Sequence, residues 1–178
     1  MTNLKFAGIV ESGAPLAVWK STREAASTSL SAETIDVEFN LKPLPSLAEI
    51  ESQWQACDDP VMKERLYRKR GVRKVVGDGD ITKMPLWIWR IGGALLAGQP
   101  NEAYSKFQID LRAALSSQPI AVMNIVNGSA GYLPPRELYE HDIYQVWQSP
   151  YECGSLEKLI ETAITRCAPA RRDRRDIS

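Results

Sequence analysis

The sequence of 178 residues has few of the side chains that most often hold metals or crosslink a chain. It contains one histidine, and its three cysteines are widely spaced and form no Cys-x-x-Cys pair. An odd number of dispersed cysteines is untypical of a disulfide framework or of a thiolate metal site. We therefore interpret the cysteines as buried thiols.

The chain also lacks an excess of charge of either sign, because 22 basic residues balance 22 acidic ones. Such a balance creates no overall field that would attract nucleic acid or an anionic membrane. No apolar run approaches the ~20 residues that a membrane-spanning helix needs. The first residues lack the apolar centre of a signal peptide. We expect a soluble chain, cytoplasmic by default, with no transmembrane segment and no nucleic-acid partner.

The pattern along the chain divides it into three parts. Residues 1–33 are weakly patterned, and residues 34–168 carry the periodic apolar positions of one domain. Residues 169–178 are charged without an apolar face, so we expect this tail to be disordered.

Within the central part, two apolar periodicities alternate. Alternating or continuous apolar residues predict strands at 34–41, 85–91, 93–98 and 119–126. Apolar residues at helical spacing predict helices at 46–57, 60–70, 102–115 and 155–166. This succession predicts an α/β fold, in which a mixed β-sheet is layered with α-helices. The order of the strands stays open.

Local signals support the helix starts. Ser46 and Glu49 form a capping box, and Asp59 followed by Pro60 is typical of an N-cap and the first helical position. Asn101 can cap the helix expected from Glu102.

The densest basic run lies on the second helix and has one aromatic residue, Tyr67, among its charges. Its members are Lys63, Arg65, Arg68, Lys69, Arg70, Arg73 and Lys74. A single ring offers little stacking surface for nucleic acid, so we interpret the run as a solvated helix face.

The stretch from Asn127 to Tyr144 is typical of a binding site. It follows the apolar run 120–126 and is a glycine-rich, proline-braced loop with three tyrosines. Glu102 comes just beyond the run 93–98, as Tyr132 comes just beyond the run 119–126. In α/β sheets ligands bind beyond the carboxyl ends of the strands. The two side chains would therefore converge if their strands are neighbours.

These residues resemble the carboxyl-terminal part of the catalytic domain of the neutral/alkaline, non-lysosomal ceramidases, especially bacterial ceramidase-like proteins. The likeness covers roughly residues 34–167. It is carried by the segments Leu41-Lys-Pro-Leu-Pro-Ser46, Trp87-Ile-Trp-Arg-Ile-Gly92, Pro100-Asn-Glu102, Asn127-Gly-Ser-Ala-Gly-Tyr-Leu-Pro134 and Glu137-Leu-Tyr139.

The resemblance implies roles for three residues. In the family, the glutamate of a Pro-Gly-Glu motif and the tyrosine five positions after the asparagine bind Zn²⁺ together with two histidines, and they match Glu102 and Tyr132. A further tyrosine that polarises the substrate amide matches Tyr144. The chain departs from the pattern at Asn101, where the family has glycine, and at Gln145, where it usually has glutamate.

The larger departure is that nothing matches the family's two-histidine motifs or its nucleophilic serine region. His141, the single histidine, is flanked by Glu140 and Asp142 and is typical of an exposed loop residue. The resemblance therefore implies that the chain is the second half of a ceramidase-like catalytic domain. Because the family's two histidine ligands have no match here, the chain alone cannot provide the family's full set of zinc ligands.

Each site residue also has a structural interpretation. Glu102 is a suitable acid for the first turn of a helix. Tyr132 and Tyr144 can cover the sheet with their rings, and Tyr139 between them is expected to pack. Asn127 is expected to hydrogen bond to loop backbone and so to position Tyr132.

The first functional hypothesis is a zinc-dependent hydrolase of N-acyl (amide) bonds, for which an N-acyl lipid or another N-acyl small molecule is the substrate. On this hypothesis the chain is inactive alone and needs its missing amino-terminal half or self-association. The alternative is a degenerate, non-catalytic relative that acts as a binding or assembly module. Whether the chain is an enzyme stays open between the two.

Overall fold

A four-stranded sheet organises the chain, which we describe over residues 29–168 in a computed structural model. Its strands are β1 (Leu30–Asn40), β2 (Ile81–Ile91), β3 (Ala94–Gly98) and β5 (Ile120–Met123). The spatial order is β1-β2-β3-β5, with antiparallel pairs except for the parallel pair β3 and β5. The sheet is therefore mixed, and the predicted α/β class is confirmed. The expectation for the charged tail, and most of that for the amino-terminal segment, fall outside the described residues.

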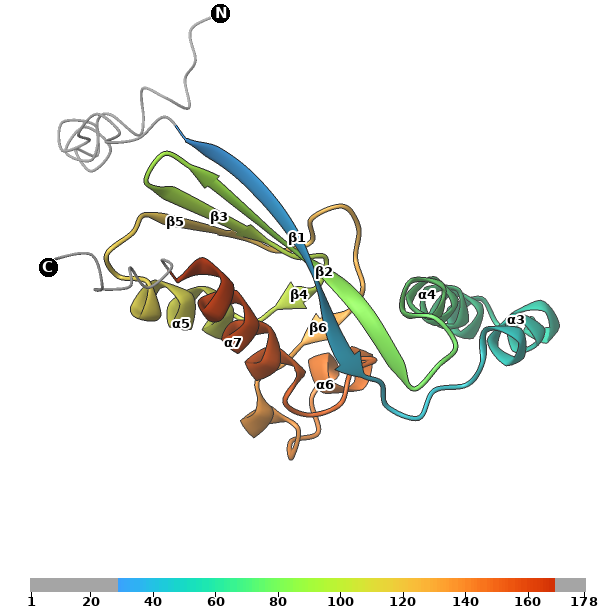
Figure 1. The fold of residues 1–178 in the computed structure, drawn as a ribbon. Coiled ribbons are helices and arrows are strands. Elements are labelled where there is room, and N and C mark those ends of the chain that lie inside the picture. The colour runs from blue at the N-terminus through green and yellow to red at the C-terminus, as the bar shows by residue number, and fades with distance from the viewer. Residues whose placement is uncertain (1–28, 169–178) are drawn as a thin grey trace, which may run out of the picture.

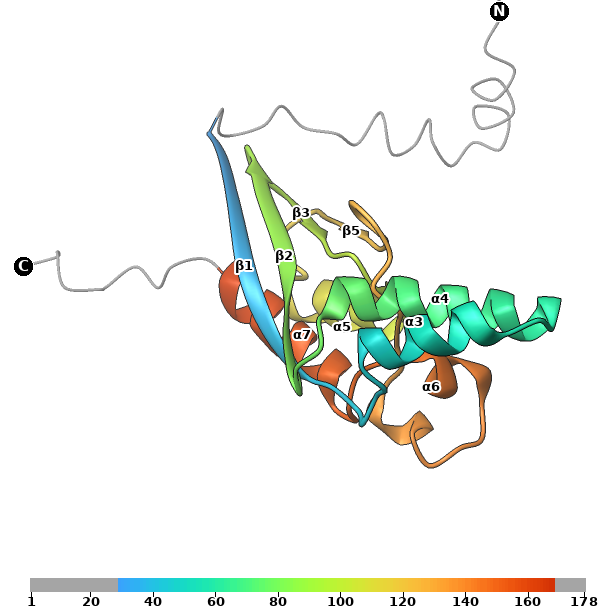
Figure 2. The ribbon, with the colours of Figure 1, turned by 90° about the vertical axis from the view of Figure 1, so that its right-hand side faces the viewer.

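Helices lie in two places relative to the sheet. They are α3 (Leu47–Ala56), α4 (Pro60–Val76), α5 (Lys106–Ala114), α6 (Tyr144–Gln148) and α7 (Ser155–Cys167), with a short 3₁₀ turn η1 (Arg136–Leu138). The helices α5 and α7 cover one face of the sheet, whereas α3 and α4 form an antiparallel pair that projects beyond it (Figures 1 and 2). No helix of the described part is long and apolar enough to cross a membrane.

The core lies between the sheet and the α5–α7 layer. Alternate residues of β1 point into it, as the burial of Ile35, Val37 and Phe39 shows. The end of β2 is tied to the end of α7, because the Arg90 guanidinium donates to the backbone oxygen of Cys167 at 3.3 Å. A cation at a helix carboxyl terminus also complements the helix dipole.

The opposite face of the sheet carries apolar side chains in contact with solvent. Trp89 of β2 lies between Ala32 of β1 and Leu96 of β3 in the strand register. Its side chain remains 49% exposed, and Met123 of β5 remains 38% exposed. Exposed apolar side chains on one face of a sheet are a feature that interaction surfaces share.

Two strands are longer than the sequence predicts. β1 begins at Leu30, inside the segment expected to be weakly patterned, and β2 begins at Ile81. Pro85 lies inside β2 and pairs with Asp36 on one side only, since β3 reaches no further along β2 than Trp87. No strand lies beside Pro85 on the β3 side to accept a hydrogen bond, so the missing N–H of proline costs no hydrogen bond of the sheet and proline is tolerated there.

The helix expected over residues 102–115 begins only at Lys106. The backbone N–H of Glu102 bonds to the Gly131 oxygen and that of Tyr104 bonds to the Leu133 oxygen, so Glu102 and Ala103 belong to a strand pair. Glu102 is therefore not a first-turn acid, and Asn101 caps no helix. Those two expectations are wrong, because a pairing partner 30 residues away outcompetes local helix propensity.

Other expectations are confirmed in part. The capping box at Ser46 and the N-cap at Asp59 are both present. Most of the basic run is exposed, but Arg73 is buried. Of the three cysteines, Cys167 is buried, Cys57 is half-buried and Cys153 is exposed. The interpretation as buried thiols is therefore confirmed for Cys167 and wrong for Cys153.

Candidate functional site beyond the ends of β3 and β5

The segments that leave β3 and β5 meet at one end of the sheet. The parallel pairing of β3 with β5 confirms that the strands preceding Glu102 and Tyr132 are neighbours. Beyond the sheet, the two segments pair again as β4 (Glu102–Ala103) and β6 (Tyr132–Leu133), near α6 (Figure 1). This is the position in which α/β sheets bind ligands.

Glu102 and Tyr132 are direct partners in this second pair. Their register is Glu102 opposite Tyr132, and the Glu102 N–H donates to the Gly131 oxygen at 2.9 Å. Side chains of register partners extend on the same side of a sheet. The carboxylate and the phenol singled out by the sequence therefore lie together, and both side chains are half-buried.

Tyr144 completes the group from a third segment. It begins α6, and its ring meets that of Tyr132 edge-on, with centroids 5.9 Å apart and planes at 74°. Such edge-to-face pairs fix the relative orientation of two rings. Tyr144 remains 50% exposed, so this side of the cluster is in contact with solvent.

A third tyrosine, Tyr104, belongs to the same cluster and was not singled out by the sequence analysis. Burial raises its pKa, and the negative charge of Glu102 adds to the rise. The signal in the sequence was the spacing of two residues from Glu102, which puts both side chains on one side of a strand. It was missed because residues 102–115 were predicted to be helical.

The surroundings of Tyr132 keep its phenol protonated. Burial raises its pKa, as do hydrogen bonding to the Glu102 carboxylate and the charge of that carboxylate. All three effects favour the neutral hydroxyl over the phenolate. Any cation that takes Tyr132 as a phenolate ligand must therefore displace a proton held more firmly than in an isolated tyrosine.

A buried amide network fixes the backbone that presents Glu102. Gln99 is fully buried, and its Nε2 donates to the Asn101 backbone oxygen at 2.8 Å and to Asn124 Oδ1 at 2.7 Å. Asn124 in turn donates to the Ala103 oxygen at 2.7 Å. These bonds join the segments after β3 and β5 through side chains, which sequence periodicity does not reveal.

Asn101 and Tyr151 extend this network into the core. The Tyr151 hydroxyl lies 2.6 Å from Asn101 Oδ1 and 2.9 Å from the Ala130 backbone oxygen. A hydroxyl has one proton to donate, whereas Asn101 Nδ2 is buried and has no partner among the described residues. Exchanging the two amide positions resolves the conflict: Asn101 Nδ2 donates to Tyr151, and Tyr151 donates to Ala130.

The loop from Asn127 to Gly131 turns by left-handed backbone conformations. Asn127 has φ 56° and an exposed side chain, which forms no hydrogen bond within residues 29–168. Gly131 has φ 101°, and a Cβ at this position would lie 2.7 Å from Pro150 Cδ. Gly131 is therefore required where the chain enters β6.

Two further residues behave as the sequence predicts. His141 is exposed in the turn before α6. Tyr139 packs, and its hydroxyl donates to the Tyr151 backbone oxygen at 3.1 Å.

The donors of this site do not by themselves fit a complete zinc centre. Glu102 and Tyr132 together present two side-chain oxygen donors of the kind that could bind a metal, whereas protein zinc sites use three or four protein ligands. Within residues 29–168 no three or more His, Cys, Asp or Glu side chains gather where they could hold a metal ion. A zinc ion here would need ligands from elsewhere.

The fold and site together define an α/β chain with an acidic and phenolic cluster at the carboxyl ends of two parallel strands. Among solved structures, it is similar to the neutral ceramidase from Pseudomonas aeruginosa, with a TM-score of 0.49 and 16% identity over 76% of this chain and 27% of that one. A structure described as ceramidase complexed with C2 aligns with a TM-score of 0.46 and 13% identity, over 76% of this chain and 29% of that one.

The chain thus spans less than a third of the length of these two proteins. No family model matches the sequence. No curated protein sequence matches it either.

Proposed function

We propose that this chain is the carboxyl-terminal portion of a ceramidase-like, zinc-dependent hydrolase of N-acyl bonds, with Glu102 and Tyr132 as metal ligands and Tyr144 as the group that polarises the substrate amide. The observation that carries the proposal is the direct register pairing of Glu102 with Tyr132. Motif spacing in the sequence points to these two residues and to Tyr144, and the three come from the separate segments β4, β6 and α6.

The chain's own side chains set what it can contribute. Glu102 offers a hard anionic oxygen, which suits Zn²⁺, and Tyr132 offers a second oxygen once it loses its proton. Tyr144 holds its ring against Tyr132 and is half exposed, and a tyrosine hydroxyl can donate to a substrate carbonyl. When bound, zinc supplies Lewis acidity and a water of lowered pKa.

The remaining ligands would come from a polypeptide that bears the family's two-histidine motifs. The exposed apolar face around Trp89 supports this part of the proposal, because half of a layered domain leaves one layer uncovered. The isolated chain is accordingly inactive.

The test is zinc analysis of the chain alone and mixed with a polypeptide carrying the histidine motifs of a bacterial ceramidase. We expect the mixture to retain zinc after dialysis and the chain alone to retain little. Glu102→Gln and Tyr132→Phe should each lower zinc affinity by about 10-fold or more in the mixture. Tyr139→Phe is the matched control, since its hydroxyl bonds only to structural groups.

Activity is measured on an N-acyl sphingoid base and on a simple N-acyl amine. Tyr144→Phe should lower kcat while leaving zinc content unchanged, because it removes a donor to the substrate and no metal ligand. Equal zinc retention by wild type and by the Glu102→Gln and Tyr132→Phe variants would refute the proposal.

A non-catalytic binding or assembly module is the second candidate, and the packing of Asn101 favours it. This residue stands where the family motif has glycine, and its buried amide serves the Tyr151 network. On this alternative, the mixture associates through the same surfaces but neither retains zinc nor cleaves either substrate.

A further inference from the structure

A second hollow lies away from the Glu102 cluster, where three distant segments meet. It occupies about 230 Å³ between the α3–α4 pair, the Pro43–Pro45 segment after β1, and the end of α6. Its apolar walls are side chains of Pro43, Pro45, Ile50, Val72, Trp147 and Pro150. The hollow is smaller than the ~300–1,000 Å³ typical of drug-sized ligand sites and suits a molecule of a few carbons.

The walls of this hollow are held in place by hydrogen bonds between the segments. The Lys42 backbone N–H donates to the Pro150 oxygen at 2.9 Å, and the Lys42 ammonium donates to the Val146 oxygen. The segment after β1 and the end of α6 are thereby joined. The hollow is formed before any ligand arrives, which reduces the entropy lost on binding.

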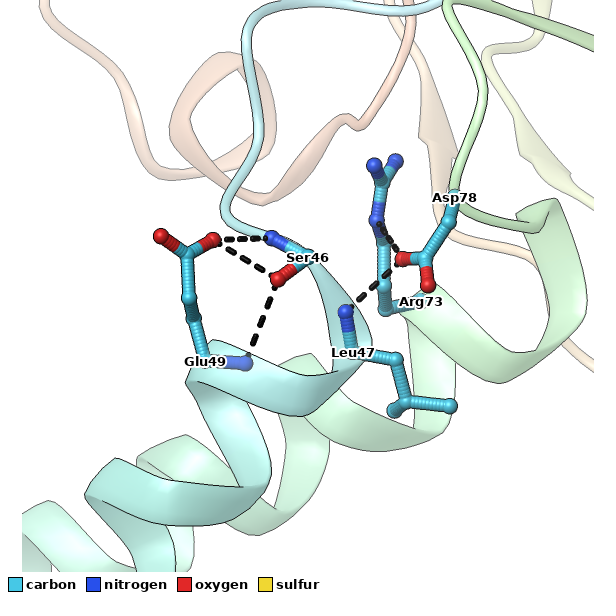
Figure 3. Close-up of polar contacts among 5 residues, drawn as sticks. All are labelled: Ser46, Leu47, Glu49, Arg73 and Asp78. Carbon is cyan, nitrogen blue, oxygen red and sulfur yellow. Dashed lines mark hydrogen bonds and ion pairs between the residues drawn. The ribbon is translucent and has the colours of Figure 1, made fainter.

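The buried guanidinium of Arg73 lines the hollow, and one of its N–H groups has no hydrogen-bond acceptor among residues 29–168. Arg73 is 5% exposed, and its Nε donates to Asp78 Oδ1 at 2.9 Å. Its Nη1 is buried without a hydrogen-bond partner among residues 29–168. Figure 3 shows the two terminal nitrogens of Arg73 directed away from Asp78. A buried guanidinium donor without an acceptor is costly, so an acceptor is expected to approach this end.

Asp78 neutralises Arg73 only in part. The same Oδ1 atom accepts from the Leu47 N–H at 2.7 Å, at the start of α3 (Figure 3). The Asp78 side chain is also 53% exposed, so water screens its charge. Lys69 adds a second cation to the lining, and none of the residues that line the hollow is acidic.

We propose that this hollow binds a small organic carboxylate, with its carboxylate on the Nη1–Nη2 edge of Arg73 and its short apolar body against Trp147 and the prolines. Two parallel N–H donors match the two oxygens of a carboxylate, which is the geometry that guanidinium groups recognise best. The apolar walls select a carboxylate that carries hydrocarbon over a bare inorganic anion. The proposal does not rest on the zinc site or on amide hydrolysis.

The test uses isothermal titration calorimetry of the full chain with four probes: hexanoate, benzoate, hexan-1-ol and inorganic phosphate. Hexanoate and benzoate should bind, and hexan-1-ol, which keeps the apolar body and loses the charge, should bind about tenfold or more weakly. Phosphate should also bind about tenfold more weakly, because it gains nothing from the apolar walls. Binding of phosphate or hexan-1-ol as tight as that of hexanoate overturns the proposal.

Variants locate the binding on Arg73. Arg73→Met should abolish hexanoate binding, while Arg73→Lys, which keeps the charge without the paired donors, should weaken it by about tenfold. Arg65→Met is the matched control on the same helix, at an exposed position that does not line the hollow, and should bind as wild type does. Binding unchanged in Arg73→Met overturns the proposal.

A further variant protects the test against misfolding of the Arg73 variants. Trp147 is 62% exposed, so Trp147→Ala should leave the fold intact while weakening hexanoate binding severalfold. The NMR resonance of the Arg73 Nε–H, observed in the wild type, should shift on adding hexanoate and stay in place on adding hexan-1-ol. An unmoved resonance at saturating hexanoate overturns the proposal.

Discussion

Tyr151 joins the candidate site to the core more directly than any of the proposed ligands. Its ring is fully buried and meets Phe39 edge-on, with centroids 5.2 Å apart, and its hydroxyl lies between Asn101 and Ala130. The residue before Glu102 is therefore fixed by a side chain 50 positions later in the chain. This contact explains how asparagine is accommodated where the resembled motif has glycine.

Tyr151→Phe tests this connection. The variant keeps the ring and removes the hydroxyl, so the buried Asn101 amide and Ala130 carbonyl lose a partner. We expect the free energy of unfolding to fall by about 1–3 kcal/mol, measured by urea denaturation at neutral pH. Tyr67→Phe, at an exposed position, is the control and should change it little.

The same residue gives a prediction for alkaline pH. Burial raises the pKa of Tyr151 above its value of about 10 in an unfolded chain. The folded state therefore binds the proton more tightly, and this contribution is fully present below about pH 10 and is lost as pH rises towards the folded pKa. Unfolding free energies measured from pH 8 to 11 should fall more steeply in wild type than in Tyr151→Phe. Parallel curves would contradict this assignment.

At the scale of elements, the sequence predicted the parts that local periodicity determines. β3, α3 and α7 begin and end within about two residues of their predicted bounds, since caps and apolar spacing define them. The pair β4 and β6 was missed because each strand has two residues, too few to show a period. Their pairing depends on Gln99, Asn124 and Gly131, which act through contacts that no local pattern encodes.

For the candidate site, the structure tests the grouping of the residues and leaves their roles as predictions. Motif spacing proposed Glu102, Tyr132 and Tyr144, and the assumption that their preceding strands are neighbours is confirmed for β3 and β5. Tyr104 was missed because the wrong secondary structure was assigned to its segment. The burial of Arg73 was not predicted, because Arg73 lies in a run of basic residues that are mostly exposed. Its charge indicates the solvated face of the helix, although its position in the helix is on the buried face.

Two glycines allow a matched test of how elements hold the site. Gly131→Ala must adopt φ near 101° and places Cβ 2.7 Å from Pro150, so the β4–β6 pair has to shift. We expect a loss of about 1–3 kcal/mol in the free energy of unfolding. Exchange of the Glu102 amide proton, which donates to Gly131, should accelerate in hydrogen-exchange NMR.

Gly71→Ala is the opposite case. Gly71 lies inside α4, and a Cβ added there would have nothing within 4 Å, so alanine adds helix propensity without a clash. We expect the free energy of unfolding to rise by about 0.5–1 kcal/mol in the same denaturation experiment. Stabilisation by both substitutions would show that the Gly131 conformation is not required.

At the scale of the whole molecule, we expect the exposed sheet face to determine whether the chain self-associates. The α5–α7 layer buries one face, while Trp89, Ile91 and Met123 remain exposed on the other or at its rim. Apolar surface of this extent is expected to be covered by the proposed missing half or, in its absence, by a second copy of the chain.

Trp89→Lys tests whether self-association occurs through this sheet face and not through other exposed apolar residues. Sedimentation velocity of the wild-type chain should show concentration-dependent self-association, and Trp89→Lys should weaken it by about tenfold, because a charge in the centre of an apolar interface must be desolvated. Trp147→Lys, at a comparably exposed tryptophan on α6, should self-associate as wild type does. A wild-type chain that stays monomeric and melts in one sharp transition would count against the split-domain proposal. It would leave the pairing of Glu102 with Tyr132 unaffected, because that pair is formed entirely within the chain.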